Sequence, residues 1–155
     1  MILTPRFLVA LAVLIGTNSL IAQQSFFKAA EGSHWLSTDL HIHTVFSDGA
    51  VWPSIRVEEA RREGLDLIAM TEHLEYQPHE EDIPHPDRNR SYAIASGMLS
   101  EDEVLQVING SEITREMPPG HINAVFVKDA NALLHSDSLS GIQEANKQGA
   151  FVFWN

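Results

Sequence analysis

The segment from Asp39 to Gly49 constrains the fold and the chemistry of this chain more than any other stretch. Side chains alternate between the two faces of an extended strand, so a strand here places His41 and His43 on one face together with Asp39. The turn residues that follow bring in the carboxylate of Asp48. Imidazole and carboxylate groups bind divalent metal ions, so the pattern predicts a metal site at a strand end. Taken alone, the two histidines also fit an ordinary half-exposed strand.

A strand, a helix and a second strand are expected next in the chain. The apolar patterns predict a strand over 35–43, a helix over Pro53–Glu63 and a strand over 65–70. Proline suits the first helical position, and Gly64 suits the C-terminal cap. This order of elements predicts a parallel strand pair with a right-handed crossover, and therefore the α/β class.

The predicted helix has an expected buried face and an expected ion pair. Ile55 and Ala60 should face the core, and Glu58 should pair with Arg62 one turn further along.

The second half of the chain alternates between loops and short apolar runs. The expected elements are a polar loop over 75–90, a helix over 91–99, a strand over 104–108 that runs into the segment 109–114, a strand over 121–127, a helix over 139–148 and a strand over 150–154. His79 and His85 lie in the long loop, and we expect them on the surface and not at a metal site.

Polar residues recur where these strands end. His43, His73 and Glu112 each follow or end an apolar run, and the carboxyl ends of parallel strands meet at one edge. His121 instead precedes its strand. It becomes a neighbour of Glu112 only if its strand turns back at Pro-Pro-Gly and runs antiparallel, so we predict a hairpin here.

Four motifs in this order resemble the PHP (polymerase and histidinol phosphatase) family of metal-dependent phosphoesterases. They are Asp-Leu-His-Ile-His-Thr with Ser-Asp-Gly, then Thr-Glu-His, then Gly-Ser-Glu, then Gly-His-Ile-Asn, and the match spans 35–155. The resemblance implies a distorted (β/α)7 TIM-like barrel and hydrolysis of phosphate monoesters or related phosphoesters. A TIM-type barrel typically needs about 250 residues, so 155 residues predict only part of one, incomplete at the C-terminus.

The resemblance also implies a ligand set of two or three divalent ions, either zinc, manganese or iron. His41 and His43 would hold the first ion, and Glu112 would bridge it to a second ion on His121. A third would lie on His73 and Asp48. The implied metal ligands are therefore His41, His43, Asp48, His73, Glu112 and His121.

Three further features follow from comparison with the family pattern. Arg115 lies near Glu112, and we expect it to clamp phosphate. The usual Thr-Asp-His triplet is Thr-Glu-His here, so no role is predicted for Glu72. A later histidine and a late Asp-x-His pair of the family are missing, so we expect a truncated member that folds poorly and lacks turnover.

Composition limits the remaining possibilities. The chain has no cysteine, so the ligands must be histidine or carboxylate. Residues 1–22 resemble a signal peptide cleaved after Ala22, with an uncleaved membrane anchor as the alternative; 23–33 would be a connector and 34–155 the metallohydrolase domain. We therefore expect an exported protein, periplasmic or extracellular, without membrane contact after cleavage.

The charge of the chain argues against a nucleic-acid partner, whereas the resemblance implies a small phosphorylated substrate. The net charge is −11, and it becomes −12 when Arg6 is removed with residues 1–22. Such a surface repels a phosphate backbone.

Two other functions fit part of the pattern. Zinc amidohydrolases also begin with His-x-His, but they usually use a bridging lysine, and Lys28, Lys128 and Lys147 do not follow a strand at the predicted site. The chain would alternatively be a metal-binding fragment without turnover. The sequence does not predict the oligomeric state.

Overall fold

The computed structural model describes residues 29–155, and residues 36–155 form one unit, which is the subject below. The predicted signal peptide, residues 1–22, and most of the connector, 23–33, lie outside the described residues. The elements are β1 (Thr38–Ile42), α1 (Pro53–Glu63), β2 (Leu67–Met70), α2 (Arg90–Ser96), β3 (Gln106–Ile113), β4 (Ile122–Val125), the 3-10 helix η1 (Ala130–Leu133), α3 (Ser138–Gln148) and β5 (Phe151–Trp154).

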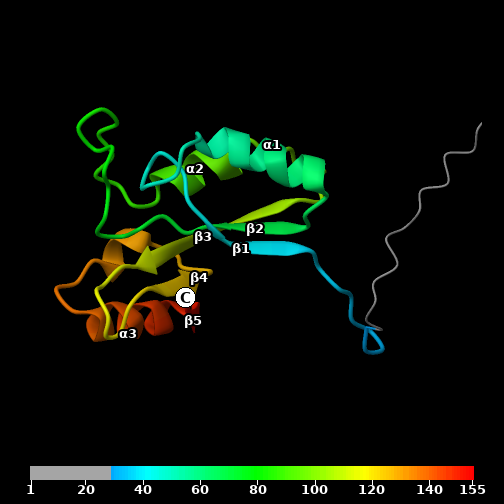
Figure 1. Ribbon diagram of the computed structural model, residues 1–155. Helices are drawn as coiled ribbons and strands as arrows, with labels where there is room; N and C mark the ends of the chain where they lie inside the picture. The colour runs from blue at the N-terminus through cyan, green and yellow to red at the C-terminus, as the bar shows by residue number, and fades with distance from the viewer. Residues whose placement is uncertain (1–28) are drawn as a thin grey trace, which may run out of the picture. The chain divides into compact units, whose positions relative to one another are not determined.

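The five strands form one mixed, curled sheet in the order β1-β2-β3-β4-β5 (Figure 1). β1, β2 and β3 are parallel, whereas β4 is antiparallel to both β3 and β5. The α/β class is confirmed, and so is the parallel pair on either side of α1. The sheet corresponds to about half of a barrel.

β3 is shared between two neighbours. Its first half, from Gln106 to Asn109, pairs with β2, and its second half, from Gly110 to Ile113, pairs with β4. A Cβ atom on Gly110 would lie 2.8 Å from the methyl carbon of Thr71 and about as close to two backbone oxygens. Glycine is therefore strongly favoured where β3 changes partner, because a Cβ atom would come too close to Thr71 and unusually close to two backbone oxygens.

Two apolar cores hold the helices to the sheet. Val57 of α1 and Ala95 of α2 pack with Ile68 and Met70 of β2 in the first core. The second core lies between α3, η1 and strands β3 to β5, and its members include Leu74, Ile113, Ala124, Leu133 and Ala145. The helices thus cover the sheet in two groups, with α1 and α2 beside β1 to β3 and α3 beside β4 and β5 (Figure 1).

The limits of α1 agree with the predicted helix. Pro53 is its first residue, and Gly64 ends it in the left-handed conformation with φ 70°. The predicted burial and pairing are partly wrong. Ala60 is buried, but Ile55 is 45% exposed, because the face of α1 that packs against the core carries Val57 and Ala60 and not Ile55. Arg61, and not Arg62, pairs with Glu58, since it also reaches Glu103 across the packing interface with the segment that precedes β3.

Other predictions needed only changes at their ends. Four strands are shorter than the predicted runs, whereas β3 continues past Ile108 to Ile113, and α2 begins at Arg90 and ends at Ser96. His85 is an exception, because it is buried: its ring contacts the carbonyls of Ile83 and Phe46. The surface position predicted for His85 is therefore wrong. Within 29–155, no helix is both long enough and apolar enough to cross a bilayer.

Candidate metal centre

Backbone pairing at the strand ends brings His73 and Glu112 side by side. The chain beyond β2 forms a single parallel bridge between these two residues. The N–H of Leu74 donates to the carbonyl of Glu112 at 2.8 Å, and the N–H of Glu112 donates to the carbonyl of Glu72 at 2.9 Å. On the other side, the N–H of Thr71 donates to the carbonyl of Ile42 at 3.0 Å, which aligns the end of β1 with that of β2.

The predicted hairpin places His121 beside Glu112. β3 and β4 are antiparallel, with Ile113 opposite Ile122 and Glu112 opposite Asn123. His121 precedes β4 and therefore lies near the end of β3. Its Nδ1 atom is 2.9 Å from Oε1 of Glu112. The hairpin is confirmed, and the antiparallel direction of β4 is what allows this contact.

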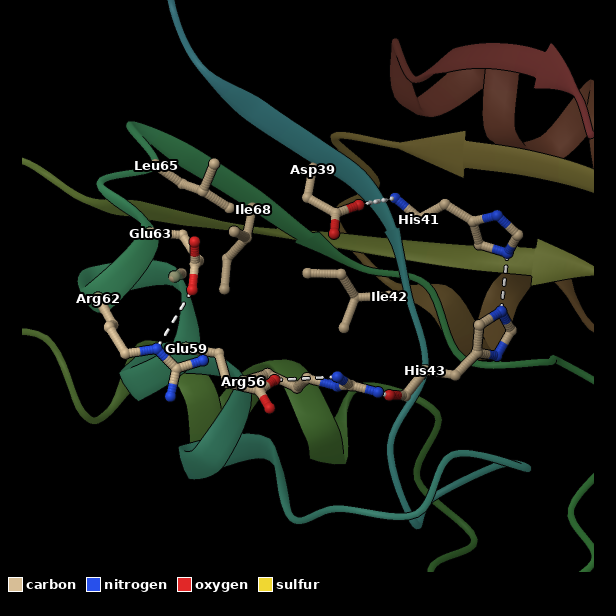
Figure 2. Close-up of a pocket in the computed structure, with 11 residues that line it drawn as sticks. Asp39, His41, Ile42, His43, Arg56, Glu59, Arg62, Glu63, Leu65 and Ile68 are labelled. Atoms are coloured by element: carbon tan, nitrogen blue, oxygen red, sulfur yellow. Dashed lines mark hydrogen bonds and ion pairs between the residues drawn. The ribbon is translucent and has the colours of Figure 1, made fainter. Parts of the chain in front are cut away.

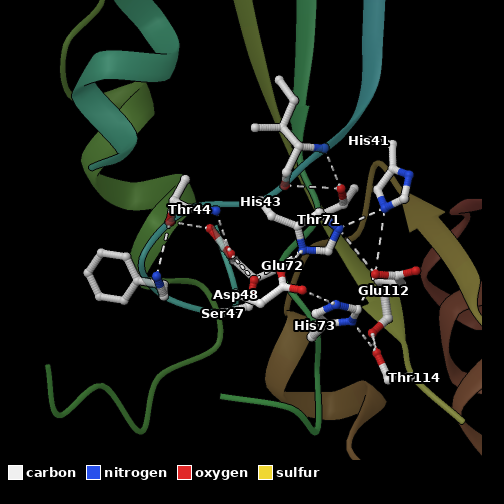
Figure 3. A network of polar contacts seen from close by, with 12 residues as sticks. His41, His43, Thr44, Ser47, Asp48, Thr71, Glu72, His73, Glu112 and Thr114 are labelled. Atoms are coloured by element: carbon white, nitrogen blue, oxygen red, sulfur yellow. Dashed lines mark hydrogen bonds and ion pairs between the residues drawn. The ribbon is translucent and has the colours of Figure 1, made fainter. Parts of the chain in front are cut away.

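Glu112 lies at the centre of the cluster and is 1% exposed (Figure 3). Its Oε2 atom is 3.6 Å from His41 Nε2, 3.2 Å from His43 Nε2 and 2.9 Å from His73 Nδ1. No contact of this oxygen satisfies the geometry of a hydrogen bond. Three ring nitrogens thus lie close to a buried carboxylate oxygen without a hydrogen bond to it. Ligand atoms that share a cation are spaced in this way.

The charges within the cluster perturb two pKa values. Burial raises the pKa of Glu112, but contacts with His43 and His73 lower it by more than burial raises it. The pKa of Glu112 is therefore well below its usual range. Burial lowers the pKa of His73, but Glu112 and Asp48 raise it more, and the result is above 6.5. A carboxylate that stays ionised beside imidazoles is the electrostatic condition for binding a cation.

Three overlapping groups of side chains have the spacing of metal ligands. They are His41 with His43 and Glu112; His43 with Asp48 and His73; and His73 with Glu112 and His121. All six predicted metal ligands belong to at least one group, so the structure brings the whole predicted set together. Within each group the candidate ligand atoms lie within 4.8 Å of one another. The donors are only imidazole and carboxylate, which suits zinc, manganese or iron.

Asp48 joins the cluster from the loop after β1. Its carboxylate oxygens lie 3.3 Å from His43 Nδ1 and 3.3 Å from His73 Nε2. Its side chain is 45% exposed, in contrast to the buried Glu112. Asp48 therefore lies at the solvent side of the cluster, and Glu112 lies at its base.

Arg115 does not lie among the candidate ligands. Its guanidinium group pairs with Glu75 and donates to the carbonyls of Thr114 and His135. These contacts are structural, so the phosphate clamp stays a prediction. Asp39 likewise accepts a hydrogen bond from the backbone N–H of His41, at 3.1 Å, and not from an imidazole ring.

Sequence reasoning missed three residues that contact the cluster. Asn155 donates from Nδ2 to Oε1 of Glu112 at 2.9 Å, and Thr114 Oγ1 lies 2.7 Å from His73 Nδ1. Glu72 is buried and bonds to the loop that carries Asp48. The Thr-Glu-His triplet marked Glu72 as unusual, but a local sequence pattern does not predict its hydrogen-bond partners Thr44 and Ser47, which lie 28 and 25 residues away.

A cavity of about 440 Å³ adjoins the cluster along β1 (Figure 2). His41 of β1 and His43, which follows β1, line it on one side, and Arg56 and Arg62 of α1 line it on the other. The guanidinium of Arg56 is held by the carbonyl of His43 at 3.1 Å and by Glu59 at 2.9 Å. The rings of His41 and His43 point away from α1 in Figure 2, so this cavity lies on the opposite side of β1 from the ring nitrogens of the cluster.

A solved structure with the same fold decides the family. It is described as a two-domain protein containing a predicted PHP-like metal-dependent phosphoesterase, from Bacteroides vulgatus ATCC 8482. It is 51% identical to this chain over 77% of the chain, with a TM-score of 0.73. The chain belongs to the PHP family.

Another similar structure is a putative metal-dependent phosphoesterase from Bifidobacterium adolescentis ATCC 15703, with 27% identity over 72% of this chain and a TM-score of 0.46. This PHP chain spans about a third of each of these proteins, 34% and 32% respectively. No protein-family model and no curated protein matches the chain. The expected PHP membership is confirmed by the Bacteroides structure.

Proposed function

We propose that this chain carries the metal centre of a phosphoesterase that hydrolyses phosphate monoesters or related phosphoesters. The main observation is the buried Oε2 atom of Glu112, which faces the nitrogens of His41, His43 and His73 without a hydrogen bond. A buried carboxylate in this state is costly unless a cation completes its surroundings. The phosphoesterase names of two similar structures agree with a metal-dependent reaction on phosphate.

The ligand assignment follows the two oxygens of Glu112. Oε2 would share one ion with His41 and His43, and Oε1 would share a second ion with His121, so Glu112 would bridge the pair. His73 would hold a third ion with Asp48, which its Nε2 atom faces. When bound, paired divalent ions polarise a phosphoryl oxygen and lower the pKa of a coordinated water towards neutrality.

The side chains of the centre have separate tasks in this proposal. Glu112 would hold two ions close together, because its two oxygens face different histidines. His121, whose side chain is 41% exposed, lies where a small phosphorylated substrate can approach. In residues 29–155 no lysine or arginine forms an ion pair with Glu112 or Asp48. The charge of a bound phosphate would therefore be neutralised mainly by the ions.

The seven-stranded barrel implied by the resemblance belongs to the same proposal. The described strands follow one another in sequence order around a curled sheet, which supports a barrel. The activity of the whole enzyme is likewise proposed and not established, since the chain spans about a third of its relatives.

The amidohydrolase alternative lacks its characteristic lysine among the described residues. Lys147 pairs with Glu144 on the surface of α3, and Lys128 is exposed beside η1. The other alternative, a metal-binding fragment without turnover, differs from the proposal only in activity.

Metal content and phosphatase activity test the proposal together. The 155-residue chain, and the longest open reading frame that contains it, would be loaded with manganese or zinc and assayed with p-nitrophenyl phosphate. Glu112→Gln should abolish activity and reduce the bound metal per chain. His79→Gln, in an exposed part of the long loop, is the matched control and should change neither.

The outcomes separate the three functions. Turnover that survives chelation contradicts a metal-dependent mechanism. Hydrolysis of amide substrates in place of p-nitrophenyl phosphate favours the amidohydrolase reading. Metal binding without turnover in either version leaves only the metal-binding fragment.

Export is also proposed, on the pattern of residues 1–22. Mass spectrometry of the protein recovered from the periplasm or medium should give a mature N-terminus at Gln23. Recovery of the uncleaved chain with the membranes would favour the anchor.

A further inference from the structure

Glu72 is a buried carboxylate whose hydrogen bonds come from one loop. It is 5% exposed, and among residues 29–155 it has no lysine, arginine or histidine within ion-pair distance. Oε2 accepts from the N–H of Thr44 at 3.0 Å, Oε1 accepts from Thr44 Oγ1, and Oε2 accepts from Ser47 Oγ (Figure 3). Burial of a carboxylate without a cation is tolerated only where such donors satisfy it.

The loop that Glu72 holds is the one that carries Asp48. The N–H groups of Ser47 and Gly49 both donate to the carbonyl of Thr44, at 3.0 and 2.9 Å. A Cβ atom on Gly49 would lie 2.6 Å from the backbone of His43 and Thr44, so the loop folds directly back over the end of β1. Glu72 therefore fixes a short, tight loop against the metal centre.

Ser47 connects Glu72 to a candidate metal ligand. Its hydroxyl oxygen lies 2.5 Å from Oε2 of Glu72 and 3.1 Å from Nδ1 of His43. An ionised carboxylate only accepts hydrogen bonds, so the single proton of this hydroxyl must point to Glu72. The oxygen is then an acceptor towards His43, which favours the tautomer of His43 with its ring proton on Nδ1.

The neighbours of His43 support the same tautomer. Oδ1 of Asp48 lies 3.3 Å from Nδ1 and is a second acceptor on that side. On the other side of the ring, Nε2 faces His41 Nε2 at 2.7 Å and Oε2 of Glu112 at 3.2 Å. A proton on Nδ1 leaves the lone pair of Nε2 directed into the group of His41, His43 and Glu112.

We propose that Glu72 is a positioning residue that acts through Ser47. Together they hold the proton of His43 on Nδ1, so that Nε2 is prepared to bind a metal ion. Partners of this kind orient a ligating histidine and typically change metal affinity about 10- to 100-fold when removed. Only the last step, metal binding by Nε2, rests on the proposed function.

The tautomer can be measured without metal. Long-range ¹H–¹⁵N spectra of the histidine-labelled 155-residue chain, in chelator at about pH 8 where neutral imidazole dominates, distinguish the two ring nitrogens. The His43 signals would be assigned by their loss in His43→Gln. We expect Nδ1 to be protonated. A proton on Nε2, or an equal mixture of tautomers, overturns the proposal, whatever the metal affinity.

Metal affinity then tests the path through Ser47. Ser47→Ala and Glu72→Gln should each weaken cobalt binding about 10- to 100-fold, and the double variant should lose little more, because both changes break one path. Thr44→Val is the matched control. It removes a hydroxyl bond to the same carboxylate but leaves Ser47 in contact with His43, so binding should stay within about threefold of wild type.

Folding of each variant would be checked by circular dichroism. Wild-type affinity in folded Ser47→Ala, or an equal loss in Thr44→Val, contradicts the proposed path. If the wild-type chain shows the expected tautomer but binds no cobalt, the proposed metal function fails and the role of Glu72 in setting the tautomer stands.

Discussion

Nδ1 of His121 lies 2.9 Å from Oε1 of Glu112, although His121 immediately precedes β4 and Glu112 lies next to the last residue of β3. The contact exists because β4 runs antiparallel to β3, while β1, β2 and β3 are parallel. One reversal of direction thus adds a candidate ligand that precedes a strand to candidate ligands that lie at strand ends. The candidate centre depends on this hairpin.

Asn155→Ala should weaken metal binding without unfolding the protein. Nδ2 of Asn155 donates to the Glu112 oxygen that faces His121, so its loss frees that carboxylate to rotate. We expect a decrease in zinc affinity of about 10-fold, measured by competition with a chromophoric chelator. Asn146→Ala, on the exposed side of α3, is the control. Equal zinc affinities in the two variants would show that Asn155 does not contribute to metal binding.

Gly110→Ala should destabilise the fold by about 1–3 kcal/mol, as overpacking typically does. The added methyl group would meet Thr71, the carbonyl of Met70 and the carbonyl of Ala124, and two of these three atoms are backbone. Urea denaturation measures the change. Gly97→Ala, at an exposed helix end with φ −67°, should cost clearly less. A neutral result for Gly110→Ala would contradict the close approach of β2, β3 and β4.

Chelation should lower the melting temperature of the metal-loaded protein. A ligand that binds only the folded state stabilises it by about 2.7 kcal/mol at 100 times its Kd. Calorimetry with and without EDTA measures the loss, and Glu112→Gln should show little or no response. An equal response in wild type and variant would place the bound metal elsewhere.

The stability of the metal-free protein should depend on pH through His73. Its pKa is raised above 6.5 in the folded state, mainly by Glu112 against the opposing effect of burial. Its contribution to stability is therefore fully present below pH 6.5 and is lost as the pH rises through the folded pKa. The low pKa of Glu112 keeps the partner ionised throughout this range.

Melting temperatures of wild type and His73→Gln in EDTA would test this dependence. The wild type should have its larger advantage near pH 6, and the advantage should shrink near pH 8. Added zinc should reverse the trend, because protons compete with metal for the same nitrogen. An advantage independent of pH would show that His73 is neutral throughout.

Local sequence was sufficient to predict the elements that present the ligands. The alternation of a strand puts His41 and His43 on one face, and Pro53 and Gly64 mark the two ends of α1. Pro-Pro-Gly predicted the reversal before His121. These predictions succeeded because the backbone conformation, and the face to which a side chain points, depend on residues within a few positions in the sequence.

The contacts around the ligands were decided by tertiary structure. Glu72 bonds to Ser47 across 25 residues, and Asn155 reaches Glu112 across 43. His85 is buried although its loop is polar, because Phe46 offers a carbonyl to its ring. Arg115 lies near Glu112 in sequence, but its guanidinium pairs with Glu75. A hydrogen bond needs both partners in place, and for these residues the partner is brought there only when the sheet and its loops have packed.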